Sequence, residues 1–596
     1  MSDDPEDDQP GDDGLSNVTP LRPDSEQPEP EDTGDLPPAD VPPAPEDPGP
    51  ERDCALLPLN DFGNGQRLVA HFGGDMLWVP RLGWHVWTGK VWAKDPDEIG
   101  LRHKAQQIGP LIELEIPHLR PSERDQALID EERALVRERA ELGRKGGEGA
   151  VERIGKIDGR LRELERELGA WRKRIGRHHT FAKDAGNSNR IKNMVGEASV
   201  HLSRHVDEMD AEALEVACET GVLRFSVTRD DDEGMAPVAE HALVPHSREQ
   251  LITKMMPVEY DPHAQAPRFQ AFLERVQPAA EMRRFLQRWF GLSMTAITGE
   301  QKLVFLHGAG ANGKSVLVDL MGRILGDYSA TAKVESLTGK NRRGGGDATP
   351  DLVPLIGARM VRASEPEEAE RLQEGTVKEL TGGEPILVRA LHSDFVEVRP
   401  VGKITISGNH KPQIRGTDDG IWRRFLMVPW DVQIPKEERD PMLGERLWAE
   451  RSGILNWLIE GLEDYLANGL QEPEAVLEAT REFRSESDPV GAFLEAACVV
   501  TGEEADFLKS KEIVEAFQFW RMEQGESEWR NGTVSRAIKE KSRRWKSPTT
   551  GRGFAEVKRS IMGYSGIRFQ DAFQRRFSGR EAPGSGSGAG WSGDWG

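Results

Sequence analysis

The stretch QKLVFLHGAGANGKSVLVDLMGRIL, residues 301–325, contains the motif that decides the fold class of this chain. Within it, G-x-x-x-x-G-K-S runs from Gly308 to Ser315, after an apolar run at 303–306 and before an amphipathic helical pattern. This order is typical of a P-loop, because the glycines let backbone N–H groups surround phosphate and the helix N-terminus adds positive potential. Lys314 is expected to reach the β- and γ-phosphates, and Ser315 to bind Mg²⁺. The predicted nucleotide-binding residues are Gly308, Ala309, Gly310, Ala311, Asn312, Gly313, Lys314, Ser315 and Val316.

Two later strands are expected to bring polar side chains to this loop. Hydrolysis needs a carboxylate that holds Mg²⁺ or polarises water, and Glu365 follows the strand-like run 360–363. Asn409 follows a second short apolar run at 404–406, where an amide can orient water, although an asparagine there could also simply close a turn.

An arginine pair follows these two positions. Arg423 and Arg424 precede another apolar strand, and one of them could act as an arginine finger on a neighbouring subunit's γ-phosphate. The sequence does not distinguish between the two. Arginine pairs are common, so the position after Glu365 and Asn409 is what favours this interpretation.

Between these strands, ELTGGEPILVRALHSDFVEVRP (379–400) contains two β-type runs around a polar turn. The pattern predicts a hairpin. Arg389 and His392 could be carried on it as projecting side chains.

The region ahead of the P-loop has three recognisable parts. LWVPRLGWHVWTGKVW (77–92) predicts a β-hairpin whose tryptophans pack a small sheet, with a platform for bases as the alternative. Residues 121–177 predict an antiparallel helical hairpin interrupted by GRKGGEG, and 268–290 predict further helices. His178 and His179 adjoin without another ligand at metal spacing, so we expect no metal there.

The net charge of −24 is unevenly distributed along the 596 residues. Residues 1–52 carry 17 acidic and two basic side chains with 13 prolines, which predicts a disordered tail, either a solvating arm or an acidic competitor for a basic site. Residues 530–576 carry 13 basic and three acidic side chains. Bulk acidity therefore does not exclude a nucleic-acid partner, and the predicted contacts in this segment are Arg543, Arg544 and Lys546.

Composition excludes several other classes of protein. The three cysteines are far apart and odd in number, which argues against a disulfide framework or a cysteine-rich zinc site. No apolar run reaches the length of a membrane span, and the N-terminus lacks the features of a secretory signal. We therefore expect a cytoplasmic multidomain protein with no membrane partner.

The order of the motifs resembles that of the phage/plasmid primase-helicase family, whose motor is a superfamily 3 helicase of the AAA+ class. The resemblance rests on GAGANGKS (308–315), ASEPEE (363–368), LTGGEPILVRAL (380–391), ISGNHKPQIRGTDDGIWRRF (406–425) and ESDPVGAFL (486–494). It is strongest over residues 301–430. Weaker likeness extends to the region before the P-loop and to a C-terminal part similar to a winged-helix domain.

This resemblance implies roles for the motif residues. Lys314 and Ser315 match the P-loop pair, Glu365 the Walker B acid and Asn409 sensor 1, with Ser315 and Glu365 holding Mg²⁺. Arg423 and Arg424 match the finger region, and Arg389 and His392 match a hairpin that contacts DNA in the pore of a ring. The family implies a homo-hexamer that hydrolyses ATP between subunits and moves 3′ to 5′ on single-stranded DNA, with a separate primase or single-strand-binding protein as a possible partner.

The expected fold class is α/β: an AAA+ superfamily 3 helicase core, a mixed α/β N-terminal region with a helical hairpin, and a C-terminal winged-helix-type domain. The expected parts are a tail (1–52), an N-terminal domain (53–290), the ATPase core (291–435), a helical segment (436–482), a basic domain (483–577) and a Gly/Ser-rich tail (578–596). We expect no primase polymerase domain.

The function favoured by these features is an ATP-dependent replicative helicase of a phage, prophage or plasmid, acting on single-stranded and forked DNA. The alternatives are a DNA-stimulated ATPase that remodels origin DNA or loads replication partners without processive unwinding, and a DNA-tethering scaffold with a degenerate nucleotide site. The intact P-loop argues against the scaffold.

Overall fold

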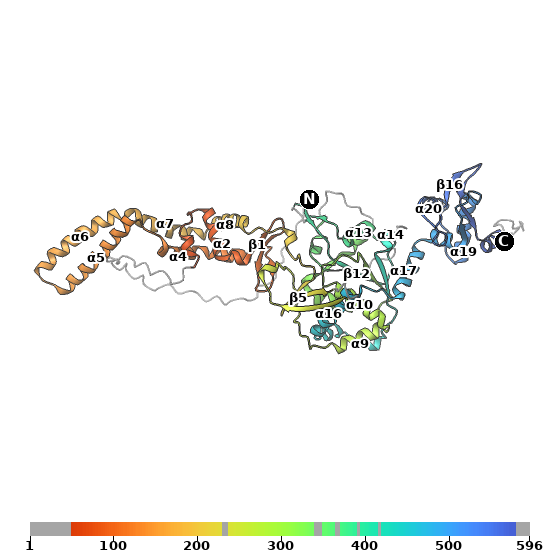
Figure 1. The fold of residues 1–596 in the computed structure, drawn as a ribbon, viewed down its shortest axis with the longest axis horizontal. Coiled ribbons are helices and arrows are strands. Elements are labelled where there is room, and N and C mark those ends of the chain that lie inside the picture. Colours follow the sequence, from red (N-terminus) through yellow and green to blue (C-terminus); the bar gives the residue numbers. More distant parts are fainter. Residues whose placement is uncertain are drawn as a thin grey trace, which may run out of the picture. The chain divides into compact units, whose positions relative to one another are not determined.

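A computed structural model describes residues 49–228, 237–338, 349–363, 370–389, 394–414 and 419–579 (Figure 1). Two predicted site residues, Glu365 and His392, lie outside these ranges, as do most of the two predicted tails. The described residues form two compact units, one of residues 1–57 with 109–183 and the other of residues 58–108 with 184–596. None of the described helices is long and apolar enough to cross a membrane.

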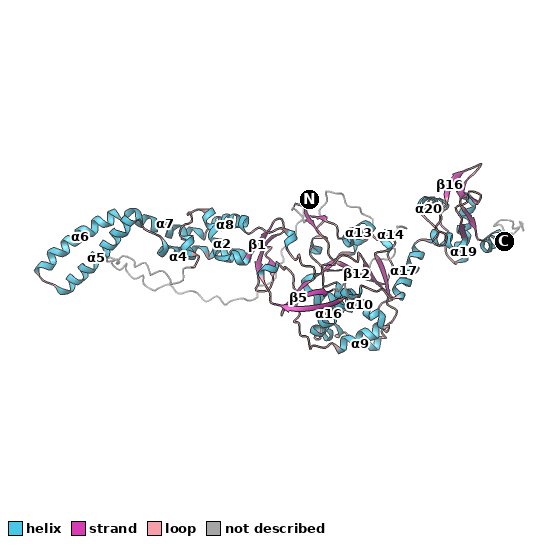
Figure 2. Ribbon diagram, viewed as in Figure 1, coloured by secondary structure: helices cyan, strands magenta, loops and turns pink. Residues whose placement is uncertain are grey.

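The first unit is helical (Figure 2). Its helices are α1 (Glu51–Cys54), α4 (Ile108–Glu115), α5 (Glu123–Lys145), α6 (Glu148–Glu167) and α7 (Gly169–Ala185). The predicted helical hairpin is confirmed as α5 and α6, which turn at Gly146 and Gly147, where both residues have positive φ angles that favour glycine. The second run, expected as one helix, ends at Glu167 and restarts as α7.

Charge pairs connect the two arms of this hairpin. Every side chain of α5 is at least partly exposed, and Arg139 lies 2.7 Å from Asp158 across the arms. Arg160 binds Glu131 at 2.8 Å in the same way. Exposed pairs of this kind contribute about 0.2–1 kcal/mol each, so the arms depend on many weak contacts.

The second unit begins with small sheets and their supporting helices. The helices are α2 (Asp61–Phe72), α3 (Ile99–Gln106) and α8 (Ser188–His201). One antiparallel sheet comprises β1 (Met76–Val79), β2 (Gly83–Trp87) and β3 (Trp92–Lys94), and another comprises β4 (Glu215–Cys218), β5 (Gly221–Thr228) and β6 (Val238–Val244). The predicted tryptophan hairpin is confirmed: Trp84 and Trp92 are buried, and the indole N–H of Trp92 donates to the carbonyl of Arg248 at 2.9 Å. The packing interpretation of these tryptophans therefore holds.

A five-stranded parallel sheet forms the centre of the second unit (Figure 1). Its strands are β7 (Leu303–His307), β8 (Ser329–Ala332), β9 (Met360–Ala363), β12 (Lys403–Gly408) and β13 (Phe425–Pro429), in the order β13-β7-β12-β9-β8. Parallel strands need crossover connections, and the carboxyl ends of the strands meet at one edge. The P-loop strand β7 thus lies between β13 and β12.

Strand periodicity explains how both faces of this sheet are covered. Leu303 and Phe305 pack on one face with Phe483, whereas Val304 and Leu306 pack on the other with Trp289. The helices that accompany the sheet are α9 (Pro267–Val276), α10 (Ala280–Leu292), α11 (Lys314–Leu325), α12 (Val334–Leu337), α13 (Glu374–Gly382), α14 (Asp419–Trp422), α15 (Leu443–Trp448), α16 (Arg451–Asn468) and α17 (Glu474–Ser487). The helices expected over 268–290 are confirmed as α9 and α10.

The segment after β9 forms a separate hairpin, as predicted. Its strands β10 (Ile386–Val388) and β11 (Val396–Val398) pair antiparallel. The turn between them includes residues outside the described part of the chain.

The C-terminal module has its own apolar core. Its helices are α18 (Pro489–Ala497), α19 (Ser510–Glu523), α20 (Asn531–Arg544) and α21 (Asp571–Ser578). Its strands are β14 (Cys498–Val500), β15 (Phe507–Lys509), β16 (Ala555–Lys558), β17 (Met562–Ser565) and β18 (Ile567–Phe569). Asp488 caps α18 by accepting from the backbone N–H of Gly491 at 3.0 Å, which explains the Asp-Pro-x-Gly pattern of this segment.

Candidate nucleotide site

The P-loop connects β7 to α11 at the carboxyl edge of the parallel sheet. A Cβ on Gly308 would lie 2.0 Å from the carbonyl oxygen of Trp430, which leaves no room for a side chain. Gly313 has a φ of +83°, and a Cβ there would lie 2.9 Å from the ring of Phe272 on α9. Both glycines of the motif are therefore required by the path of the backbone.

Lys314 lies at the start of α11 and is buried to 5% exposure. Its ammonium donates to the carbonyl of Gly308 at 2.7 Å and to Oδ1 of Asn312 at 3.1 Å. It also donates to Oδ1 of Asn409 at 3.1 Å. Asn409 directly follows β12, so two adjacent parallel strands bring these predicted residues together.

A reciprocal contact between Asn312 and Trp430 supports the loop. The indole N–H of Trp430 donates to the carbonyl of Asn312 at 2.6 Å, and the amide of Asn312 donates to the carbonyl of Trp430 at 3.1 Å. Trp430 directly follows β13 and is fully buried. Sequence reasoning missed Trp430, because no motif joins it to a loop more than a hundred residues earlier.

Ser315 lies in the first turn of α11 and is exposed, at the end of the helix where N–H groups favour anions. Glu365, its predicted partner in binding Mg²⁺, lies outside the described residues, although the strand that precedes it is confirmed as β9. Over the described ranges, no three or more His, Cys, Asp or Glu side chains converge as a metal site. His178 and His179 instead approach Glu115 and Glu113, at 3.2 Å and 2.6 Å.

His307 ends β7, one residue before the loop. Burial lowers the pKa of its imidazole, and the nearby charges of Lys411 and Lys314 lower it further. The ring is therefore neutral at pH 7.

The two adjacent arginines have different environments. Arg423 is exposed, whereas Arg424 is 8% exposed and its guanidinium donates to the carbonyl of Gly420 at 2.8 Å. It also donates to Oγ1 of Thr381 and Oε1 of Gln301, both at 3.2 Å. Burial, with repulsion from Arg423, lowers the pKa of Arg424. Arg424, one of the two predicted finger residues, therefore has its guanidinium engaged in hydrogen bonds inside the fold, whereas Arg423 is exposed.

Arg389 is the last residue before the hairpin turn, and His392 lies outside the described residues. The guanidinium of Arg389 lies 5.2 Å from the ring of Phe395, and its backbone exchanges hydrogen bonds with Thr349 at 2.8 and 2.9 Å. The arginine side chain is half-buried at the base of the turn.

The C-terminal basic residues divide into two groups. Arg543, Arg544 and Lys546 are exposed at the end of α20. Lys541 is buried and forms an ion pair with Asp488, so it stabilises the module instead of adding to its surface charge.

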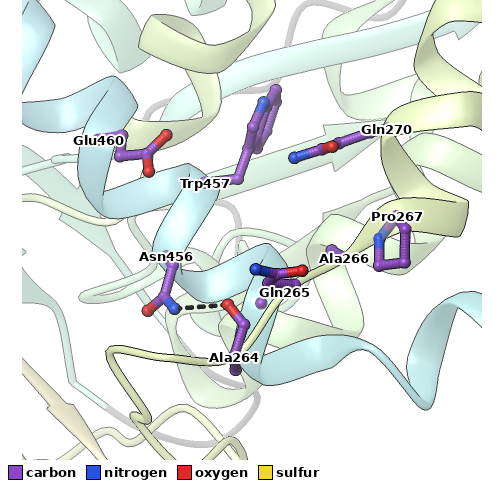
Figure 3. A pocket seen from close by; sticks show the side chains of 9 residues that line it. Ala264, Gln265, Ala266, Pro267, Gln270, Asn456, Trp457 and Glu460 are labelled. Atoms are coloured by element: carbon purple, nitrogen blue, oxygen red, sulfur yellow. Dashed lines mark hydrogen bonds between the residues drawn. The ribbon is translucent and has the colours of Figure 1, made fainter.

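A separate hollow of about 310 Å³ lies between the start of α9 and α16 (Figure 3). In it, the amide of Asn456 donates to the carbonyl of Ala264 at 3.0 Å, near Trp457. Its lining residue Gln270 is on the exposed side of α9, opposite Phe272, which contacts the P-loop. The hollow is therefore not part of the nucleotide site.

Two protein-family comparisons match this chain, one before the P-loop and one from the P-loop strand onward. The family described as D5 N terminal like matches residues 65–278, and a family of unknown function (DUF5906) matches residues 306–424. "Putative helicase L207/L206" of Acanthamoeba polyphaga mimivirus is 29% identical over 240 residues, which cover 37% of this chain and 25% of that protein. "Putative helicase 022R" of Frog virus 3 (isolate Goorha) is 29% identical over 165 residues, covering 27% and 17%.

The matched part of the chain thus spans a quarter or less of the length of these two viral relatives. Among solved structures, the apo C-terminal region of NrS-1 aligns over 53% of this chain and 79% of that one, with 12% identity. Its TM-score of 0.33 is too low to establish a shared fold.

Proposed function

We propose that this chain, which matches the D5 N terminal like family over residues 65–278 and resembles viral proteins named putative helicases, is an ATP-dependent DNA helicase that forms a ring and moves along single-stranded DNA. The observation that carries the proposal is the 3.1 Å contact between Lys314 on the P-loop and Asn409 after β12. The strand order β13-β7-β12-β9-β8 supports an AAA+ core, in which the P-loop strand lies between the last strand and the sensor strand.

The residues of the loop fit a magnesium nucleotide. Gly308 leaves no room for a side chain beside the Trp430 carbonyl, as a tight phosphate-binding loop requires, and Lys314 offers a cation to phosphate. Ser315 and Glu365 would hold Mg²⁺, which neutralises phosphate charge when bound. On nucleotide binding we expect the Lys314 ammonium to exchange its contact with the Gly308 carbonyl for phosphate oxygens.

Asn409 and Arg423 are proposed to complete the reaction geometry. The amide of Asn409 can accept from or donate to an attacking water, and its contact with Lys314 keeps it beside the phosphate site. Arg423 is exposed just before β13, which suits a guanidinium that crosses to the nucleotide of an adjacent subunit. A head-to-tail ring would supply one such contact at every interface.

DNA is proposed to meet the chain at two places. The β10–β11 hairpin carries Arg389 at its turn, and a ring would direct such hairpins to the central strand. In the C-terminal module, α19 and α20 followed by the β16–β17 hairpin form an arrangement typical of winged-helix domains. The exposed basic end of α20 suits phosphate contacts.

Strand displacement from a forked duplex, with ATP and Mg²⁺, tests the proposal. The wild-type protein should release the strand, and Lys314→Ala should abolish both displacement and ATP turnover. Lys173→Ala is the matched control, because that lysine is exposed on α7, in the compact unit that holds none of the residues proposed to bind nucleotide or DNA. DNA-stimulated ATP turnover without any displacement by an assembled ring would refute the helicase and favour an ATPase that remodels DNA.

A further inference from the structure

The tip of the β16–β17 hairpin presents two consecutive apolar side chains to solvent. Lys558 pairs with Met562 in the strand register, and Arg559, Ser560 and Ile561 form the turn. Ile561 is 53% exposed and Met562 is 40% exposed. Single exposed apolar residues are ordinary, but adjacent ones at the end of a hairpin form a small projecting apolar surface.

The β16–β17 hairpin makes contacts with the rest of the C-terminal module. The guanidinium of Arg559 lies 4.7 Å from the ring of Phe507 and donates to the carbonyl of Glu504. β17 also pairs with β15, so the strand leading from the tip has neighbours on both sides. These contacts restrain the hairpin that carries the apolar tip. Less conformational entropy is therefore lost when the tip binds a partner.

The surroundings of the tip favour a polyanion. Lys558 is exposed beside Ile561 and Met562, and Lys539 of α20 pairs with Glu556 of β16 at 2.8 Å. That pair fixes the hairpin next to α20, whose exposed basic end carries Arg543. Two apolar side chains cover far less than the roughly 800 Å² per partner of a stable protein interface, whereas a small apolar wedge flanked by cations suits a nucleic-acid groove.

We propose that this tip, defined by Lys558–Met562, is a wedge for duplex DNA, in which Ile561 and Met562 enter the minor groove at the fork and unstack a base step. Lys558 contacts the adjacent phosphate and α20 lies on the neighbouring backbone. Apolar side chains inserted between base steps are an established means of opening a duplex. The inference rests on the proposed DNA function, and it assigns the duplex to this hairpin and the single strand to the β10–β11 hairpin.

Equilibrium binding without ATP separates this proposal from helicase activity. The probes are a forked duplex with 2-aminopurine at the junction and the single strand of the same sequence. Wild-type protein should bind the fork and raise the 2-aminopurine fluorescence. Ile561→Ser/Met562→Ser should lower the ratio of fork to single-strand affinity by about tenfold and remove the fluorescence rise, since two apolar contacts are lost.

The matched control is Ile99→Ser/Met442→Ser, which removes the same two residue types from exposed sites on α3 and just before α15. It should behave as the wild type, and Ile561→Phe should keep the fluorescence rise. An unchanged affinity ratio and fluorescence in the Ile561→Ser/Met562→Ser protein would overturn the wedge, as would an equal loss of affinity for both probes. Either result is independent of strand displacement, so a failed helicase assay would not decide it.

Discussion

Replacing Arg424 with alanine should destabilise the second unit, whereas replacing Arg423 should stop ATP turnover without unfolding it. Arg424 gives hydrogen bonds to Gly420, Thr381 and Gln301 from a nearly buried position. Losing these three bonds should cost about 3 kcal/mol, at about 1 kcal/mol each. The second unit has more than 400 residues. At about 2.1 cal/mol/K per residue its unfolding entropy is about 1 kcal/mol/K, so the loss corresponds to a fall in Tm of about 3 °C.

Arg423 has an exposed side chain, so Arg423→Ala should change the free energy of unfolding by less than about 0.5 kcal/mol. If it acts as a finger, its loss should lower kcat for ATP by about 10³-fold or more. Thermal unfolding and steady-state ATP turnover of both variants, measured on the same preparations, provide the two readouts.

Mixing variants tests whether Arg423 acts across a subunit interface. Arg423→Ala subunits keep a complete P-loop, and Lys314→Ala subunits keep a complete finger, so an equal mixture should regain activity at about a quarter of its interfaces. Each variant alone is the control. The assignment would be refuted if Arg424→Ala abolished turnover at unchanged Tm while Arg423→Ala remained active.

Three further results are expected. Gly308→Ala should destabilise the loop by about 1–3 kcal/mol and abolish binding of a fluorescent ATP analogue, because its Cβ would lie 2.0 Å from the Trp430 carbonyl; normal binding would contradict this. Because the pKa of His307 is lowered in the folded protein, the unfolded chain binds more protons below about pH 6.5. The free energy of unfolding, measured with urea, should therefore fall as the pH drops through that value. His307→Gln should make this fall smaller. Arg543→Ala/Arg544→Ala should weaken DNA binding and reduce the salt slope by about 2, and an unchanged slope would exclude this surface.

Local pattern was enough to predict much of the fold. The P-loop, the strands that lead to Glu365 and Asn409, the β10–β11 hairpin and the helical hairpin all depend on short-range signals: glycine spacing, runs of β-branched residues and helical periodicity. Such signals are readable because each element must satisfy its own backbone hydrogen bonds and present one apolar face. Even the position of Asn409 near Lys314 follows from the rule that parallel strands end at one edge.

Burial and partner choice could not be predicted in the same way. Arg423 and Arg424 are adjacent and chemically identical, but only Arg424 is buried and hydrogen-bonded to Thr381 and Gln301, whereas Arg423 is exposed. Lys541 is one of the 13 basic residues at 530–576, and the sequence gives no sign that it is buried. In the structure it is buried and forms an ion pair with Asp488.

By itself, then, the sequence determined the local elements, the phosphate-binding loop and the uneven distribution of charge. Only the tertiary structure decided the strand order, the hydrogen bond from Trp430 to the P-loop and the contact between Arg559 and Phe507 beside the β16–β17 tip. The physical reason is that these features join residues far apart in the chain, and side-chain type sets what a residue can bind but not which distant group it will meet.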